Sequence, residues 1–224
     1  MSSAQLATEA DIDDPEYYRR EAMGAFAHEV RTPLTSIRMV MELARRQSAK
    51  GQLLLDSELA EMLNTSIDDL QQLADDLQET SRLERGKLPL SHGPCDLAAA
   101  IHAAGDLCIA RIEPAGDIPA GVEGPWDAAR LVRALAGFAG AANRMGDGSG
   151  AVNLTCERRP AKILLHFESG TPTRSARPIA ADAGFAFFRS RQFVLAMGGS
   201  VDCDRSERYA RITVRLPLLV GDGG

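Results

Sequence analysis

The sequence predicts a mixed fold, in which a long two-helix hairpin is followed by an α+β domain. Three observations carry this prediction. Apolar residues recur at alternating steps of three and four through the first part of the chain, a glycine- and proline-rich break follows, and shorter apolar segments come after it. A length of 224 residues suits one or two domains.

The hairpin is expected from two helices with heptad seams. The first begins near Pro15, which suits a first-turn position, and runs to about Ala49, with a break at Lys50-Gly51. A second helix is expected over about 53–85. The seam residues are Met23, Phe26, Val30, Pro33, Ile37, Val40 and Ala44, then Leu59, Leu63, Ile67, Leu70, Leu73 and Leu77. Because an isolated hairpin cannot bury both seams, we expect a homodimer that forms a four-helix bundle.

The remaining boundaries follow composition. We expect a loose leader over 1–13, the hairpin domain over 14–85, a linker over 86–95, an α+β domain over 96–220 and a tail over 221–224. In the α+β domain we expect a layer of helices on one face of a sheet. The expected helices cover 97–112, 126–145 and 184–197, and the expected strands cover 151–158, 162–168, 200–204 and 209–217.

Composition excludes several classes of function. A net charge of −6 argues against nucleic acid as the main partner, because phosphate contacts need clustered basic residues. No apolar run is long enough to span a membrane, and the N-terminus lacks a signal pattern, so we expect a cytoplasmic protein. The four cysteines show no CxxC spacing, so we expect buried reduced thiols and no metal site.

Residues 26–37, Phe-Ala-His-Glu-Val-Arg-Thr-Pro-Leu-Thr-Ser-Ile, concentrate the chemistry of the chain. His28 lies off the seam, between Phe26 and Val30, so we expect an accessible ring. A neutral imidazole has a free lone pair and can act as a nucleophile. A lone histidine beside a glutamate would more often be an ordinary exposed helix residue, but the whole run, with a proline inside a helix and a heptad pattern on both sides, argues against that interpretation. The other histidines, His92, His102 and His166, are expected to be structural.

The neighbours of His28 have distinct expected roles. Glu29 can accept a hydrogen bond from the far ring nitrogen or take its proton. Thr32 lies at i+4, on the same face of the helix. Pro33 lacks an N–H, so the helix is expected to bend just past His28.

This run resembles the H box of sensor histidine kinases. His28, Glu29, Arg31, Thr32, Pro33 and Leu34 all stand where that family has them. The resemblance implies that His28 carries a phosphoryl group, that Thr32 positions water for dephosphorylating a partner, and that receiver domains dock beside the histidine. Exposed residues of the same helix are then plausible receiver contacts, or equally a solvated face: Arg31, Arg38, Glu42 and Arg45.

The second half resembles the ATP-binding domain of the same family in outline. Asp127-Ala-Ala-Arg-Leu looks like the lead-in to its asparagine helix, Gly184 and the pair Gly198-Gly199 keep its spacing, and Leu216-Pro217 resembles its terminal strand. Glycines 146, 148 and 150 are expected to form a helix-to-strand turn.

The nucleotide-binding residues implied by the resemblance are degenerate. Gly137 and Ala141 replace its asparagines, and alanine offers Mg²⁺ no oxygen ligand, while Asn143 faces elsewhere. In Glu168-Ser-Gly170-Thr-Pro172, Glu168 replaces the adenine-binding aspartate and Pro172 replaces a glycine. In the glycine turn, Gly184 is kept but Ala186 replaces the second glycine. Bulky Phe185, Phe187 and Phe188 are expected to fill space that a nucleotide would need.

We therefore expect a histidine phosphotransfer protein built on a degenerate histidine-kinase frame. His28 would take a phosphoryl group from the aspartyl phosphate of one response-regulator receiver and pass it to another, without ATP or a metal of its own, because the receiver supplies Mg²⁺. Retained Glu29 and Thr32 fit descent from a kinase or a retained phosphatase activity. The alternatives are a soluble histidine kinase with an atypical ATP site, a phosphatase acting through Thr32, and a non-catalytic dimeric pseudokinase scaffold.

Overall fold

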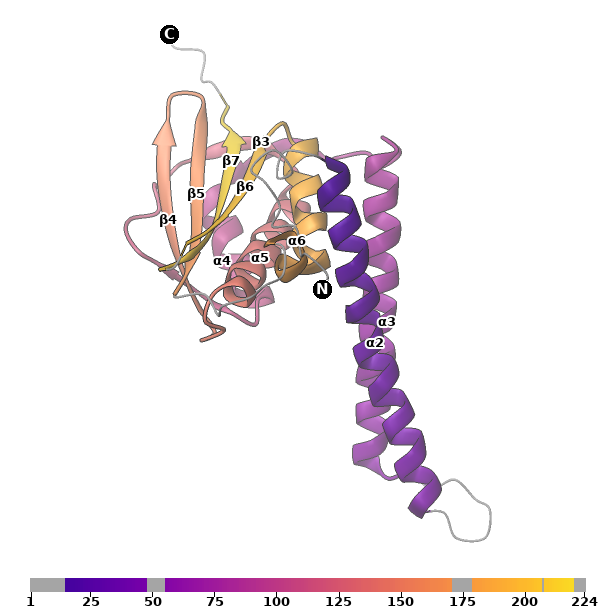
Figure 1. Cartoon of the computed structure of the whole chain (residues 1–224). Helices are drawn as coiled ribbons and strands as arrows, with labels where there is room; N and C mark the ends of the chain where they lie inside the picture. The colour runs from indigo at the N-terminus through magenta and orange to yellow at the C-terminus, as the bar shows by residue number, and fades with distance from the viewer. Residues whose placement is uncertain (1–14, 48–54, 171–178, 207, 220–224) are drawn as a thin grey trace, which may run out of the picture.

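The hairpin forms as the heptad pattern predicts. The computed structural model describes residues 15–47, 55–170, 179–206 and 208–219. Helix α2 (Pro15–Gln47) runs as one helix through Pro33, and α3 (Ser57–Glu84) lies beside it (Figure 1). Asp56 caps α3 by accepting a hydrogen bond from the backbone N–H of Leu59 at 2.9 Å. The expected break at 50–51, the leader (1–13) and the tail (221–224) lie outside the described residues.

The last three residues of the expected linker, 93–95, belong to a strand. Strand β1 (Gly93–Asp96) pairs antiparallel with β3 (Glu123–Trp126), so the chain forms a two-stranded sheet where a linker and the start of a helix were expected. Prolines and glycines in both strands hide the strand pattern, and proline is tolerated at sheet edges. Trp126 is buried, and its indole N–H donates to the carbonyl oxygen of Pro217 at 2.8 Å.

The main sheet has the order β2-β4-β5-β7-β6, with β2 parallel to β4 and the other pairs antiparallel. The helix expected over 97–112 ends earlier, and its last residues form β2, because pairing with β4 overrides the local helical signal. The elements are α4 (Leu97–Leu107), β2 (Arg111–Pro114), α5 (Ala128–Met145), β4 (Ala151–Arg159), β5 (Lys162–Ser169), α6 (Ile179–Ala196), β6 (Ser200–Arg205) and β7 (Ala210–Pro217).

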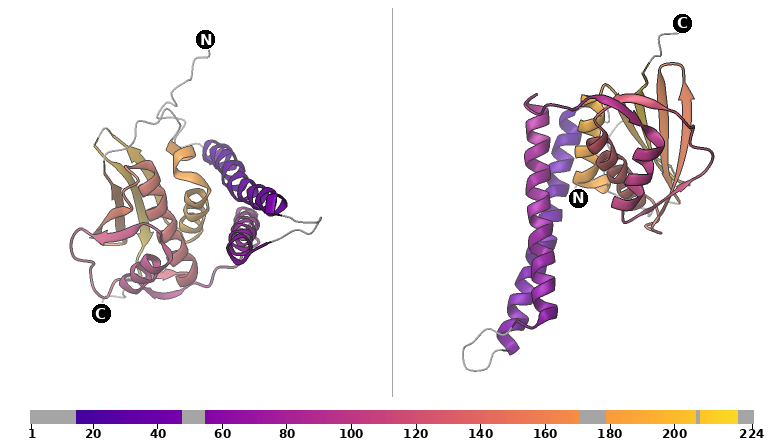
Figure 2. Two further views of the ribbon diagram at one scale, coloured as in Figure 1. Left: turned by 90° about the horizontal axis from the view of Figure 1, so that it is seen from below. Right: turned by 180° about the vertical axis from the view of Figure 1, so that it is seen from behind.

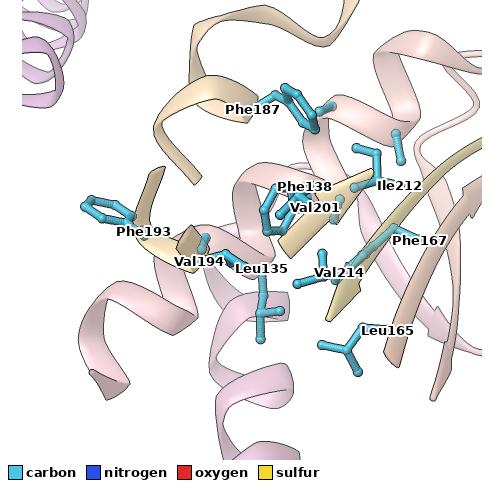
Figure 3. Packing of buried hydrophobic residues seen from close by; sticks show 14 of the residues in the cluster. Leu135, Phe138, Leu165, Phe167, Phe187, Phe193, Val194, Val201, Ile212 and Val214 are labelled. Carbon is cyan, nitrogen blue, oxygen red and sulfur yellow. The ribbon is translucent and has the colours of Figure 1, made fainter. Parts of the chain in front are cut away.

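The domain is layered as the sequence predicts. Buried and partly exposed residues alternate along β5 and β7, so one face of the sheet packs against helices. The sheet, the helices α4 to α6 and the hairpin form three successive layers, with the helices α4 to α6 in the middle (Figures 1 and 2). Figure 3 shows the core between sheet and helices, where Phe138 and Phe187 lie near Phe167 and Ile212.

The hydrophobic core continues from this domain into the hairpin. Tyr17, Tyr18 and Ala22 of α2 are buried in the same cluster as the residues of the sheet. The ring of Tyr18 lies 6.0 Å from that of Phe187, measured between centroids. The two parts of the chain are therefore packed together. No helix among the described residues is long and apolar enough to cross a membrane.

Candidate functional site around His28

His28 is exposed on α2, while Phe26 and Val30 on either side are half-buried, as the off-seam position predicts. It lines a cleft of about 570 Å³ between α2 and the second domain. The described residues that line this cleft are Glu21, Gly24, Ala25, Ala27, His28, Glu29 and Arg31 of α2, with Arg144 of α5 and Ala181, Asp182 and Gly184 of α6. A phosphoryl donor can therefore reach the imidazole from solvent.

Glu29 is held by the second domain. Its Oε1 atom accepts a hydrogen bond from the backbone N–H of Phe185 at 3.1 Å. The approach depends on Gly184, whose φ of 79° belongs to the left-handed half of the Ramachandran map. A Cβ at Gly184 would stand 2.8 Å from Glu29 Oε1 and 2.9 Å from Arg144 Nη2. One carboxylate oxygen of Glu29 is therefore bound to the backbone of α6, whereas the sequence predicted that this carboxylate would contact the imidazole of His28.

The other predicted residues of the H-box helix differ in exposure. Thr32 is exposed, as a residue acting on a docked partner must be, and Pro33 is buried. The four predicted partner contacts are all exposed along α2: Arg31, Arg38, Glu42 and Arg45. Glu42 accepts a hydrogen bond from Arg46 Nε at 3.2 Å. All four follow His28 along α2.

An ion-pair network that sequence reasoning missed joins the hairpin to the second domain. Asp76 of α3 is buried, and it pairs with Arg133 of α5 at 2.8 Å and with Arg189 of α6. Glu79 pairs with Arg133 at 2.6 Å and with Arg130 at 3.2 Å. Buried pairs of this kind hold two surfaces in one register, because separating them leaves charges unpaired.

A sequence signal for this network existed. Asp76 lies three residues after Leu73 of the seam and four before Thr80, which is also buried. The carboxylate of Asp76 faces α5 and α6. The buried face of α3 therefore extends beyond the heptad seam to include Asp76 and Thr80.

The two positions where the resembling family has asparagine differ in exposure. Ala141 has no exposed surface, whereas Gly137 is half-buried and lines a cavity of about 700 Å³ together with Gly140 and Asn143. At Gly137, an added Cβ would stand 2.2 Å from Ser190 Oγ and 3.2 Å from the carbonyl oxygen of Ala186. Helix α6 therefore lies against α5 where a larger side chain would otherwise project, and Asn143 instead accepts a hydrogen bond from the N–H of Gly150 at 2.9 Å.

Glu168, which was expected to stand at the adenine-binding position, does not face the helices. Glu168 lies on the outer face of β5, where its Oε2 atom accepts hydrogen bonds from Arg211 at 2.7 and 2.9 Å. This pairing raises the pKa of Arg211. Ser169 is the buried residue that faces the helices, beside Gly146. Ser169 likewise lacks a carboxylate, Gly170 lies beside Asp147, and residues 171–178 lie outside the described part.

The phenylalanines of α6 form the contact between the two domains. Phe185 lies 5.0 Å from Phe26 of α2 in an edge-on arrangement, and Phe187 lies 6.0 Å from Phe138 of α5. Phe185, Phe187 and Phe188 are all buried. Through Phe26 and Tyr18 of α2, they fill space at the boundary with the hairpin.

The remaining polar residues have structural roles. The Nδ1 atom of His92 lies 2.9 Å from the carbonyl oxygen of Pro125, and that of His166 lies 3.0 Å from Thr213 Oγ1. All four cysteines are unpaired, two of them fully buried, and burial raises the pKa of the Cys156 thiol to about 11. Gly148 and Gly150 form the predicted turn between α5 and β4 with positive φ.

Comparisons with known proteins agree with this geometry. Residues 18–86 match the family model of the His Kinase A (phospho-acceptor) domain. The chain is 27% identical over 223 residues to the probable sensor histidine kinase TcrY of Mycobacterium tuberculosis, covering 89% of the chain and 46% of TcrY. Among solved structures it is similar to the histidine kinase AdeS of Acinetobacter baumannii, with a TM-score of 0.68, 18% identity, and coverage of 86% of the chain and 98% of AdeS.

A second solved structure is the histidine kinase ThkA in complex with the response regulator TrrA, with a TM-score of 0.54 and 14% identity, covering 94% of the chain and 69% of that one. The chain spans 36% and 46% of the length of two curated relatives it matches. It has a histidine-kinase-type architecture, with a phospho-acceptor hairpin followed by an ATPase-like α/β domain.

Proposed function

We propose that this chain acts in two-component signalling as a histidine phosphotransfer protein, with His28 as the carrier and without ATP-dependent autophosphorylation. The observation that carries the proposal is a contrast within one structure. The imidazole of His28 is open to a cleft, while the two positions where the resembling family has asparagine hold Ala141, which has no exposed surface, and Gly137, whose Cβ position is blocked by Ser190 of α6.

The residue types at these two positions of α5 disfavour nucleotide chemistry. Phosphoryl transfer from ATP depends on a metal ion that neutralises charge on the transferring group. Ala141 has neither an oxygen ligand nor exposed surface, and Ser169 has no carboxylate for adenine. The contacts of Asp76 with Arg133 and Arg189 also hold the second domain against the hairpin. An ATP-binding domain must move to deliver its phosphate, and this network opposes such movement.

A receiver domain can supply what the chain lacks. Its aspartyl phosphate is the donor, and its bound Mg²⁺ stabilises the charge of the transferring group. The bond between phosphorus and the aspartyl oxygen breaks, the carboxylate keeps the electron pair, and a bond between phosphorus and the His28 nitrogen forms. The structure of ThkA with TrrA supports a receiver as the class of partner. Arg31, Arg38, Glu42 and Arg45 would meet it on α2.

The protein would work as a homodimer. Large apolar side chains stay exposed on the hairpin even after the two helices have packed together. A second copy would cover them in a four-helix bundle. The exposed residues are Met23, Leu34, Met39, Leu43, Leu55, Met62 and Ile67.

The experiment is transfer from a radiolabelled phospho-receiver, with and without ATP, to wild type and His28→Gln. We expect label on the wild type in the absence of ATP and none on the variant. Labelling of wild type only when radiolabelled ATP and Mg²⁺ are the donors would establish the kinase instead. Receiver binding without any label on His28 would establish a scaffold.

Exposed Thr32 favours a second candidate activity, dephosphorylation of the receiver. Thr32 lies on the face of α2 that carries His28, one turn further on. In this case Thr32→Ala would slow the loss of receiver phosphate while His28 still accepts label. An unchanged rate of loss would remove the phosphatase.

A further inference from the structure

We infer that Arg144 of α5 contacts the phosphoryl group while it is transferred to or from His28. The inference rests on the proposed function and assigns to the second domain a direct part in it.

The cleft brings the two residues together from different domains. His28 and Arg144 both line it, although α2 and α5 are far apart in sequence. Its described lining contains two cationic side chains, Arg31 and Arg144. Arg31 belongs to the same helix as His28, so Arg144 is the cation that the second domain contributes.

Contacts on both sides fix the place of Arg144. Its Nη2 atom donates to the carbonyl oxygen of Ala183 in the first half of α6. The same atom and Glu29 Oε1 both lie within 3 Å of the Cβ position of Gly184. Glu29 follows His28 in the chain, so the guanidinium is held next to the residue that adjoins the phosphoryl acceptor. A guanidinium has five N–H donors, which leaves donors for a phosphoryl oxygen.

The charge of the cleft requires such a cation. Three carboxylates line it, from Glu21, Glu29 and Asp182. Asp182 is compensated by Arg205 at 2.6 Å, and one oxygen of Glu29 takes the N–H of Phe185. A phosphoryl group brings about two further negative charges. Without Arg144, the cleft would oppose that charge with Arg31 alone.

The proposed contact stabilises the phosphoryl group while it is being transferred. In the transition state, negative charge spreads over the three equatorial oxygens, where a planar guanidinium can donate two parallel hydrogen bonds. The carboxylate of the receiver leaves with its electron pair, and the His28 lone pair forms the new bond. Arg144 exchanges no proton in this step and works in both directions.

The test compares Arg144→Gln and Arg144→Lys with wild type in single-turnover transfer from a saturating radiolabelled phospho-receiver. We expect Arg144→Gln to lower the rate constant by about 10²-fold, as loss of one fixed donor to a developing charge does. Arg144→Lys keeps the charge without the fork and should give an intermediate rate. The receiver Kd should stay within about threefold of wild type, since a transition-state contact changes the rate more than binding. Arg158→Gln, an exposed arginine of β4, is the matched control and should transfer at the wild-type rate.

The outcomes separate the inference from the function beneath it. Wild-type label with an unchanged rate in Arg144→Gln overturns the role of Arg144 and leaves the phosphotransfer function standing. A loss that appears wholly in the receiver Kd overturns it too. Absence of label on wild-type His28 overturns the proposed function itself. If Arg144→Gln fails to fold, Arg144→Lys carries the test, and a wild-type rate for it together with a wild-type pH profile counts against the inference.

Discussion

Asp76 of α3 and Arg133 of α5 form a hydrogen-bonded ion pair, with 2.8 Å between Oδ1 and Nη2, across the boundary between hairpin and second domain. The other oxygen of Asp76 takes Arg189 of α6, and Gln72 donates to Oδ1 at 2.8 Å. Burial lowers the pKa of Arg189, and its Nε atom has no hydrogen-bond partner. Asp76 is therefore the carboxylate that Arg189 pairs with, and it shares Arg133 with Glu79.

Replacing Asp76 with alanine should lower the free energy of unfolding by about 3 kcal/mol, because the buried charge of Arg189 loses its partner. Urea unfolding followed by circular dichroism measures the loss. Asp75→Ala, the exposed neighbour in α3, is the control and should change the free energy by less than about 0.5 kcal/mol. Equal effects of the two substitutions would show that the network does not stabilise the domain contact.

Gly184→Ala should destabilise the fold by about 1–3 kcal/mol, because φ of 79° with ψ of 177° is a conformation that glycine alone adopts readily. The new Cβ also meets the Glu29 carboxylate and the Arg144 guanidinium. Gly105→Ala is the control, since this glycine lies in α4 with no atom within 4 Å of its Cβ position. Gly105→Ala should stabilise the fold by about 0.5–1 kcal/mol. Thermal unfolding of both variants and of the wild type measures the two effects.

Local patterns predicted what local chemistry determines. The period of the apolar residues gave both long helices, and the off-seam position of His28 gave its exposure. The outward position of Glu168 follows from the same kind of local pattern. Ile163, Leu165 and Phe167 alternate inward along β5, and the same alternation makes Ser169 the inward residue.

The rest depends on partners distant in sequence. Strands β1 and β3 exist because they pair with each other, with Pro94 opposite Pro125, and neither segment has an alternating apolar pattern of its own. The hydrogen bond from Phe185 to Glu29 spans 156 residues and starts at a backbone N–H, which no side-chain motif announces. The cleft around His28 could not be predicted because its second wall comes from the other domain.

The close approach of α6 to α5 at Gly137 gives a prediction about the lost asparagine. Gly137→Ala should destabilise the fold by about 1–3 kcal/mol, because its Cβ would meet Ser190 Oγ at 2.2 Å. Combining it with Ser190→Ala should cost less than the sum of the single changes, by about 1 kcal/mol in a double-mutant cycle. Gly140→Ala, with its nearest contact at 3.6 Å, is the control. Strict additivity would mean that the helices separate freely, and Gly137 would then not bar a larger residue.

The decrease in the free energy of unfolding at low pH should depend on Asp127, which caps α5. Burial acts to raise its pKa, but hydrogen bonds from the N–H groups of Ser91 and Arg130 and from the Arg130 guanidinium together lower it from 3.8. A depressed pKa in the folded state means that this stabilisation is present above pH 3.8 and is lost as pH falls through the folded value.

Asp127→Asn should therefore flatten the fall in the free energy of unfolding below pH 3.8, because asparagine caps the helix without titrating. Urea titrations at a series of pH values from neutral into acid measure the slope. Asp106→Asn, at an exposed position in α4, should keep the wild-type slope. An unchanged acid slope in Asp127→Asn would assign the acid sensitivity to other carboxyl groups.

The exposed apolar residues of the hairpin predict the assembly state. Ile67 of α3 is 46% exposed in the single chain, although it belongs to the heptad seam. Placing a carboxylate there costs several kcal/mol only if the position becomes buried against a second copy. Ile67→Asp should therefore convert a dimer to a monomer in size-exclusion chromatography with light scattering, with its helical circular dichroism retained. Thr65→Asp adds the same charge two residues away, on another face of α3, and should remain dimeric. A wild-type monomer at all concentrations, or a dimeric Ile67→Asp, would contradict a four-helix bundle formed through this seam, and the exposed residues would then belong to a contact with a different protein.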